Sequence, residues 1–294
     1  MIVVEDRIDA MARRQFGSTA MVESVQPLSG GAYNSTYEVQ LRAQPPVILR
    51  VAPEPEHQYR SETEMMRNEA ATTPHLAPIA HLLPEILGVD WSREIIDRDY
   101  MWQSKIGGVP ATRAFLIHGR DAMVPLFAEI GMVTAAVHSI AGPHFGTVRG
   151  QHFSKWSDAV MYRLSEIVYD TERAGLDTRA AQNALESAQQ ASDVLDRVTE
   201  PRLLHGDLFI PNLILDEDSL RIVGVLDHDR AFWGDPAADW GIHAMTGRTE
   251  AERRAFHDGY GSPVGDEAVA HIYRALHAGA IALERHRLGR DRKS

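Results

Sequence analysis

Three polar residues stand next to short apolar runs in the second half of the chain. Asp207 and Asn212 lie in the stretch 203–212, and Asp227 directly follows the apolar run 222–226. A polar turn separates that run from one that begins just after Asn212, a pattern typical of a β-hairpin. Because a hairpin brings its two ends together, the sequence predicts that Asn212 and Asp227 lie side by side, near Asp207.

These residue types at this spacing suit phosphoryl transfer. A carboxylate can accept or orient the proton of a substrate hydroxyl, while an amide oxygen and a second carboxylate hold the metal ions that neutralise phosphate charge. Magnesium prefers such hard oxygen ligands. The separation between Asp207 and Asn212 is that of the catalytic loop of kinases. We therefore predict that Asp207 is the catalytic base and that Asn212 and Asp227 bind Mg²⁺.

Three motifs in this region resemble the aminoglycoside phosphotransferase family, a kinase-like group of enzymes that phosphorylate small molecules. They are His205-Gly206-Asp207-x-x-x-x-Asn212, Asp227-His228-Asp229 and Gly234-Asp235-Pro236-Ala237-Ala238-Asp239. The resemblance implies that Asp239 braces the catalytic loop and that His205 orients it, with Asp229 as a further supporting residue. It also implies ATP or GTP as the phosphoryl donor and a small molecule as the acceptor.

A glycine-rich turn in the first half of the chain is expected to approach the nucleotide phosphates, since glycine has no Cβ to obstruct backbone N–H groups. The predicted nucleotide ligands in this turn are Ser29, Gly30, Gly31 and Asn34. Arg50, in the next strand, stands where protein kinases carry a phosphate-pairing lysine, and its guanidinium can serve the same purpose. The family's Met-Arg-x-Glu pattern favours Glu69 as its partner. Glu62, seven residues earlier and on the same predicted helix face, is the alternative.

The elements that must position these residues fall into two groups. In the first, helices are predicted at 2–16 and 59–72 and strands at 21–28, 35–41, 47–51, 84–88 and 100–105. In the second, helical patterns cover 122–139, 156–174 and 178–198 and resume after 237, with one β island at 213–226. These assignments rest on apolar periodicity and on Gly and Pro at the boundaries.

We therefore expect an α+β, two-lobed protein-kinase-like fold with the active site in the cleft. The β-rich nucleotide-binding lobe is expected at 1–103 and the mainly helical catalytic and acceptor-binding lobe at 104–294, with a hinge at about 102–108. By resemblance alone, backbone groups of Ser104 and Ile106 would meet the purine ring. The acceptor pocket is expected from 152–200 and the C-terminal helices.

Composition excludes several other classes of protein. The 294 residues carry a formal net charge of −11, which argues against sequence-independent binding to nucleic acid. They include no cysteine, which excludes thiolate chemistry. The first residues lack signal-peptide order, and no apolar run is expected to span a membrane, since Glu129 interrupts the longest one. A cytoplasmic location is therefore expected, while the oligomeric state stays open.

The sequence does not identify the small molecule that accepts the phosphate. An antibiotic is the first expectation from the family, and the acidic net charge is compatible with a cationic acceptor such as an aminoglycoside. The alternatives are a metabolite such as choline, homoserine or methylthioribose, and a catalytically silent nucleotide-binding protein. A protein kinase is not expected, because only seven residues separate Asp227 from Asp235 and leave no room for a long activation loop.

Overall fold

The computed structural model describes residues 5–28, 33–240, 247–261 and 267–289. The chain divides into two compact units. Unit 1 comprises Met1–Tyr59 and Pro84–Ile106, and unit 2 comprises Arg60–Leu83 and Gly107–Ser294. The fold is α+β, with antiparallel sheets in the β-rich N-terminal part and mostly helices in the C-terminal part.

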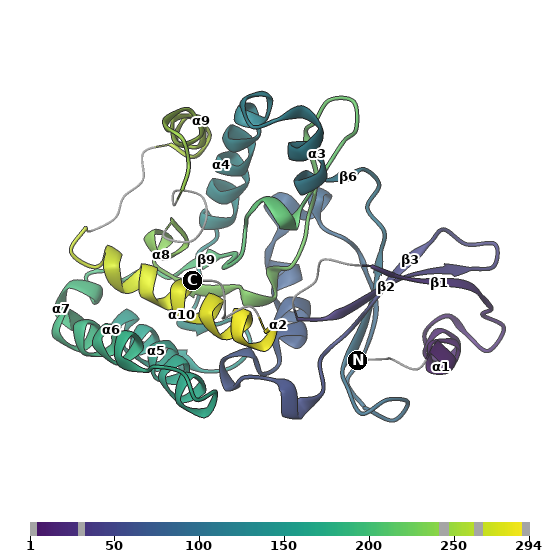
Figure 1. Cartoon of the computed structure of the whole chain (residues 1–294), viewed down its shortest axis with the longest axis horizontal. Coiled ribbons are helices and arrows are strands. Elements are labelled where there is room, and N and C mark those ends of the chain that lie inside the picture. Colours follow the sequence, from purple (N-terminus) through teal and green to yellow (C-terminus); the bar gives the residue numbers. More distant parts are fainter. Residues whose placement is uncertain (1–4, 29–32, 241–246, 262–266, 290–294) are drawn as a thin grey trace. The chain divides into compact units, whose positions relative to one another are not determined.

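Unit 1 is built on one five-stranded antiparallel sheet, of which strands β1 to β3 are labelled in Figure 1. The strands are β1 (Val22–Leu28), β2 (Ser35–Leu41), β3 (Val47–Val51), β4 (Ile86–Asp90) and β5 (Tyr100–Ser104), in the order β1-β2-β3-β5-β4. Helix α1 (Glu5–Phe16) buries Ile8, Met11 and Ala12 in the same core as the sheet. All five predicted strands of this part are present, and β2 and β3 have the predicted bounds.

The helix predicted over residues 59–72 is shorter than expected. A single 3₁₀ turn (Arg60–Glu62) comes first, and helix α2 spans only Met65–Thr72. Glu64 interrupts the helix because its backbone is left-handed, with φ 63°. Glu62 therefore does not share a helix face with Glu69, and the prediction that the two residues lie on one face was wrong.

Besides α2, the described part of unit 2 contains eight α-helices. They are α3 (Ala111–His118), α4 (Val124–His138), α5 (Trp156–Arg173), α6 (Arg179–Gln190), α7 (Ser192–Leu195), α8 (Pro236–Trp240), α9 (Glu250–Tyr260) and α10 (Ala270–Arg287). Helices α5, α6 and α10 lie side by side (Figure 1). Helix α4 packs closely on α9, where a Cβ on Gly131 or Gly259 would collide with the backbone of the facing helix.

Two small antiparallel sheets complete unit 2. One contains β6 (Val109–Pro110), β10 (Leu213–Leu215) and β11 (Ile222–Val225), of which the last two are the predicted β island. The other has the order β8-β7-β12-β9 and was not predicted. Its strands are β7 (Phe145–Thr147), β8 (His152–Phe153), β9 (Arg202–Leu204) and β12 (Phe232–Gly234). Each has only two or three residues, too few to show an alternating pattern.

Helix α4 belongs to the core of unit 2. Its Leu126, Phe127, Ile130, Val133 and Val137 all join the main hydrophobic cluster. By length and composition alone, Asp121–His138 could span a membrane, with a mean hydropathy of 1.2, so the expectation that no run reaches that length was wrong. Half of the stretch is buried inside the protein, as in the core helix of many globular domains.

Candidate active site

The loop that follows β9 is held by one buried carboxylate. Asp239 accepts hydrogen bonds from the backbone N–H groups of His205 (2.9 Å) and Gly206 (3.0 Å), and His138 Nε2 lies 3.0 Å from it. His138 in turn contacts the Tyr260 hydroxyl through Nδ1, at 2.9 Å. Burial alone would raise the pKa of Asp239, but the His138 hydrogen bond and neighbouring imidazoles hold it below its ordinary value. The carboxylate therefore stays ionised and fixes the loop from helix α8.

Gly206 lets this loop touch the segment that follows β11. Its φ is 78°, and a Cβ at this position would collide with the carbonyl oxygen of Arg230. Any other residue would be strained and would push the two segments apart. The close approach sets the loop containing Asp207 directly against residues 227–230.

Asp207 sits at the point where these segments meet. The Asn212 side chain donates from Nδ2 to both the backbone oxygen (2.9 Å) and the carboxylate Oδ2 (3.0 Å) of Asp207. Burial is the largest influence and raises the pKa of Asp207 to about 7, while the Arg230 charge and the Asn212 hydrogen bond oppose the rise. A carboxylate with a pKa near neutrality is suited to exchange a proton with a hydroxyl group at physiological pH.

The predicted hairpin brings the expected residues to one end. Strand β10 pairs with β11 so that Leu213 lies opposite Val225, and Leu226 N–H donates to the Asn212 carbonyl at 2.9 Å. Asp227 comes next and has left-handed backbone angles (φ 57°, ψ 54°). For a residue with a Cβ this conformation is strained, and such strain is concentrated at functional sites.

Glu69 joins the site from helix α2. Carboxylate oxygens of Glu69, Asp227 and Asp229 all lie within 4.8 Å of one another, and Glu69 and Asp229 are buried. Three converging carboxylates fit a divalent cation that prefers oxygen ligands, such as Mg²⁺. Both hydrogen bonds from Asn212 to Asp207 use the amide nitrogen and not Oδ1, and the role of Asn212 as a metal ligand stays a prediction. That Glu69 and Asp229 would cluster with Asp227 was not foreseen from the sequence.

Asn68 ties helix α2 to this segment. Its Nδ2 donates to the backbone oxygens of Asp229 and Ala231, both at 2.9 Å, and its Oδ1 accepts from Arg149 N–H at 2.9 Å. The residue is buried with all of these groups paired. Sequence reasoning missed it; the one available signal was a polar side chain beside the predicted Glu69.

Glu62 is engaged elsewhere. It forms an ion pair with Arg287 of helix α10 and lies 3.9 Å from Arg230. Its carboxylate is buried among these guanidinium groups, apart from the three-carboxylate group. Arg50, the expected partner of Glu69, lies buried on β3 opposite Thr36 and Met101. The pairing of Arg50 with Glu69 stays a prediction.

Some of the other residues of unit 1 that were predicted to bind the nucleotide lie outside the described part of the chain. Ser29, Gly30 and Gly31 lie outside the described residues. Asn34 is described, and its Oδ1 is buried with no hydrogen-bond partner among the residues that the structure covers. The Ser104 N–H donates to the Glu85 carbonyl at 2.9 Å, so this donor is already used within the sheet, and Ile106 is half-buried.

His205 is not a ligand of this group. It is buried, its Nδ1 accepts from Asp207 N–H at 3.3 Å, and its ring stands edge-on to His228. Burial and the neighbouring His228 lower the pKa of His205 to about 4. The imidazole is therefore neutral at physiological pH and accepts a hydrogen bond from the backbone of Asp207, while its orienting role stays a prediction.

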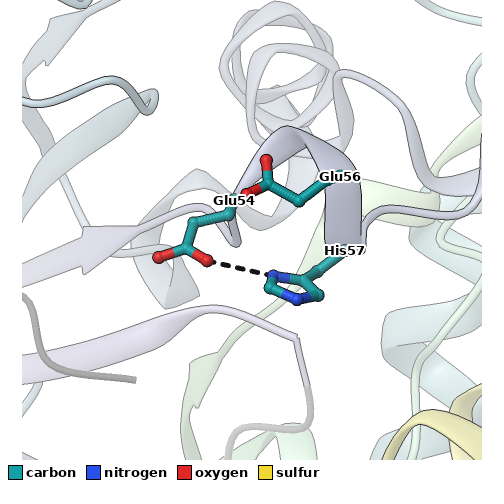
Figure 2. Close-up of side chains that lie close together, drawn as sticks. All are labelled: Glu54, Glu56 and His57. Carbon is teal, nitrogen blue, oxygen red and sulfur yellow. Dashed lines mark ion pairs between the residues drawn. The ribbon is translucent and has the colours of Figure 1, made fainter.

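A second cluster of possible metal ligands lies in unit 1. Figure 2 shows Glu54, Glu56 and His57 close together on a 3₁₀ turn. Glu54 is paired with His57 at 3.0 Å and lies 3.9 Å from Arg98. All three side chains are at least partly exposed, and such surface groups are common without a metal ion. The buried group at Asp227 is the better candidate site.

Comparison with known families gives one match over most of the chain. The model described as "Phosphotransferase enzyme family" matches residues 24–273. This range contains Arg50, Glu69, the loop with Asp207 and Asn212, and Asp227.

Solved structures with a similar fold are aminoglycoside phosphotransferases. The GDP complex of aminoglycoside 2'-phosphotransferase-IIIa has a TM-score of 0.66 at 17% identity, covering 98% of this chain and 94% of that one. APH(3'')-Id from Streptomyces rimosus, in complex with ADP and streptomycin, has 0.62 at 16%, covering 94% and 98%. A thermostable mutant of APH(4)-Ia, in a ternary complex with ADP and hygromycin B, has 0.63 at 18%, covering 96% of both chains.

Proposed function

The chain belongs to the phosphotransferase enzyme family, and from this membership we propose that it transfers the γ-phosphate of ATP or GTP to a hydroxyl of a small molecule, with Asp207 as the catalytic base. As a small-molecule phosphotransferase, it needs a proton acceptor beside the acceptor hydroxyl and a charge-neutralising site for the phosphates. Both requirements can be assigned to residues of unit 2.

The environment of Asp207 is the observation that carries this proposal. Its pKa is raised to about 7 by burial, its position is fixed by Asn212, and its backbone lies in the loop that Asp239 holds. A general base works best when its pKa is near the working pH, because it is then partly ionised and still basic. An acid placed only to close a turn would be exposed and would keep an ordinary pKa.

The metal-binding role falls to the carboxylates beside it. Asp227 and Asn212 would hold Mg²⁺, with Glu69 and Asp229 close enough to contribute. When bound, Mg²⁺ would neutralise charge on the phosphates of the nucleotide. Within unit 1, the turn with Ser29, Gly30, Gly31 and Asn34, together with Arg50 and the backbone of Ser104 and Ile106, would hold the nucleotide.

The acceptor is a small molecule with a free hydroxyl. Streptomycin, kanamycin and hygromycin B are bound by proteins of similar fold, so aminoglycosides, and with them antibiotic resistance, are the first class to test. The net charge of −11 is compatible with such cations. A hydroxylated metabolite is the alternative.

Asp227→Asn tests the metal-binding part of the proposal. In Mg²⁺ we expect nucleotide affinity to fall about 100-fold, since a charged metal ligand is lost. With EDTA present, the variant and the parent protein should bind nucleotide equally weakly. Calorimetric titration of ADP and GDP with and without Mg²⁺ measures this directly.

The matched control is Asp218→Asn, an exposed turn residue of the same hairpin. It should bind nucleotide like the parent protein. Equal Mg²⁺-dependent affinity of the Asp227 variant and the parent would contradict the assignment. Tight nucleotide binding without turnover on any acceptor would instead favour the catalytically silent alternative.

A further inference from the structure

A pocket of about 380 Å³ lies in unit 2 beside the candidate site. Helix α5, the residues just before α2, the loop 147–151 and the segment Asp229–Arg230 contribute to its wall. The Arg230 charge acts on the Asp207 carboxyl, which shows that this wall is close to the proposed base. A molecule in the pocket would therefore be near Asp207.

Four arginines line the pocket, and three of them have carboxylate partners. Arg60 pairs with Glu166 at 3.0 Å, Arg149 with Glu64 at 3.3 Å, and Arg230 with Glu284 at 3.5 Å. These ion pairs are formed by residues of unit 2 alone. They balance most of the positive charge on the pocket wall.

Arg163 is the exception. Its Nη1 is fully buried and has no hydrogen-bond partner, and no carboxylate lies within ion-pair distance in the described part of the chain. The guanidinium stacks on the Phe232 ring, with its central carbon 3.9 Å from the ring centroid. Burial and the neighbouring Arg230 lower the pKa of Arg163 to about 10, while the charge of Asp239 opposes this fall, so Arg163 still carries its charge at physiological pH.

A buried guanidinium nitrogen with neither a hydrogen bond nor an ion-paired carboxylate among the described residues is costly to the folded protein. Phe232 presents its face to the charge but accepts no hydrogen bond from the N–H groups. A carboxylate or phosphate group on a bound molecule would supply the missing partner, and guanidinium binds such groups through two parallel hydrogen bonds.

The geometry points to an acceptor that carries an anionic group, a carboxylate or a phosphate, bound by Arg163 in this pocket. This inference rests on the proposed phosphotransferase function and narrows its substrate class. The net charge of the chain is also compatible with a cationic acceptor, but that charge is summed over the whole sequence. The pocket instead places near Asp207 a guanidinium that has no ion-paired carboxylate among the described residues. Arg163 is thus a specificity-determining residue, separate from the residues that handle the nucleotide.

Binding of sugars that differ in charge tests the inference without knowledge of the natural acceptor. Glucuronate, glucose and glucosamine are anionic, neutral and cationic on closely related rings. Saturation-transfer NMR on a mixture of the three should show glucuronate as the preferred ligand of the parent protein. Inorganic phosphate should compete with it, whereas chloride at equal ionic strength should not.

Substitutions at Arg163 separate specific recognition from general charge effects. We expect Arg163→Gln to weaken glucuronate binding about 10- to 100-fold and Arg163→Lys to restore part of it. Arg173→Gln, on the exposed end of the same helix, is the matched control and should bind like the parent. Equal binding of the three sugars, or equal glucuronate binding by Arg163→Gln and the parent, would overturn the inference.

The melting temperature of the ligand-free protein and the kinetics of turnover also test the inference. Arg163→Met should raise the melting temperature of the ligand-free protein, because it removes an unpaired buried charge and keeps the packing on Phe232; a lowered melting temperature would indicate a purely structural role and contradict the inference. In turnover assays with Mg²⁺-ATP and Mg²⁺-GTP, hydroxycarboxylates should be phosphorylated with a KM raised 10- to 100-fold in Arg163→Gln and little change in kcat.

Failure of the proposed function is distinguishable from failure of this inference. Absence of Mg²⁺-dependent nucleotide binding and turnover would refute the phosphotransferase role while glucuronate binding still reports on Arg163. Efficient phosphorylation of streptomycin, kanamycin or hygromycin B, unchanged in Arg163→Gln, would support the phosphotransferase role and refute the anionic acceptor.

Discussion

The loop that contains Asp207 and the neighbouring arginine pocket differ in how their buried charges are paired. Around the loop, the Asp239 carboxylate is paired with two backbone N–H groups and with His138. In the pocket, the Arg163 guanidinium has a buried nitrogen without a partner among the described residues. A fully paired charge fixes atoms in place, while an unpaired one favours an incoming group of opposite sign. The first region is therefore built for positioning and the second for selection.

Asp239→Asn should have the larger effect on stability. The amide removes the charge that pairs with His138 and can turn an N–H donor towards the backbone donors of His205 and Gly206. We expect a loss of about 2–4 kcal/mol and a melting temperature lower by roughly 10 °C, with slower turnover because the loop loses its brace. Thermal unfolding followed by circular dichroism measures the change.

Asp218→Asn serves again as the control, since its carboxylate is exposed. If Asp239→Asn melted with the parent protein, the positioning role of this region would be refuted. The expected sign is opposite to that for Arg163→Met, and finding the same sign for both would remove the contrast between the two regions.

A smaller effect is expected from the pH dependence of stability at Asp207. Its pKa rises from an ordinary 3.8 to about 7 on folding, so the folded state binds the proton more tightly than the unfolded state. The carboxyl therefore favours folding at low pH and loses this contribution as pH rises from about 4 to 7. Asp207→Asn, which does not ionise, should become more stable relative to the parent over this interval, by roughly 5–10 °C at pH 8.

Melting curves of the two proteins at a series of pH values give this difference. It should be near zero at pH 4 and level off above pH 7. A difference that does not depend on pH would show that Asp207 keeps an ordinary pKa in the folded protein.

The sequence was sufficient for the parts of the site that lie close together along the chain. The spacing of Asp207 and Asn212, and the hairpin that returns Asp227 to them, follow from local patterns, and β10 and β11 pair as predicted. Strands β2 and β3 were predicted to the residue, because buried and partly exposed positions alternate along β2 and all residues of β3 except Arg50 are apolar.

Features that depend on contacts between distant segments were not predictable. The sheet β8-β7-β12-β9 joins strands of two or three residues, which carry no periodicity. Asn68 and Arg163 are ordinary polar residues on helices until their burial and partners are known. Glu62 was misplaced because nothing in the sequence signalled the left-handed backbone of Glu64 that ends the helical spacing.

The most direct test of the central claim is transfer of the labelled γ-phosphate of ATP or GTP to a hydroxylated acceptor by the parent protein and by Asp207→Asn. With nucleotide and Mg²⁺ saturating, the variant should bind nucleotide normally while its transfer rate falls by about 10²–10⁴-fold, the usual contribution of a general base. In the parent protein, kcat/KM should rise with pH through about 7, as the Asp207 carboxyl ionises. Undiminished transfer by Asp207→Asn would contradict the assignment of Asp207 as the base.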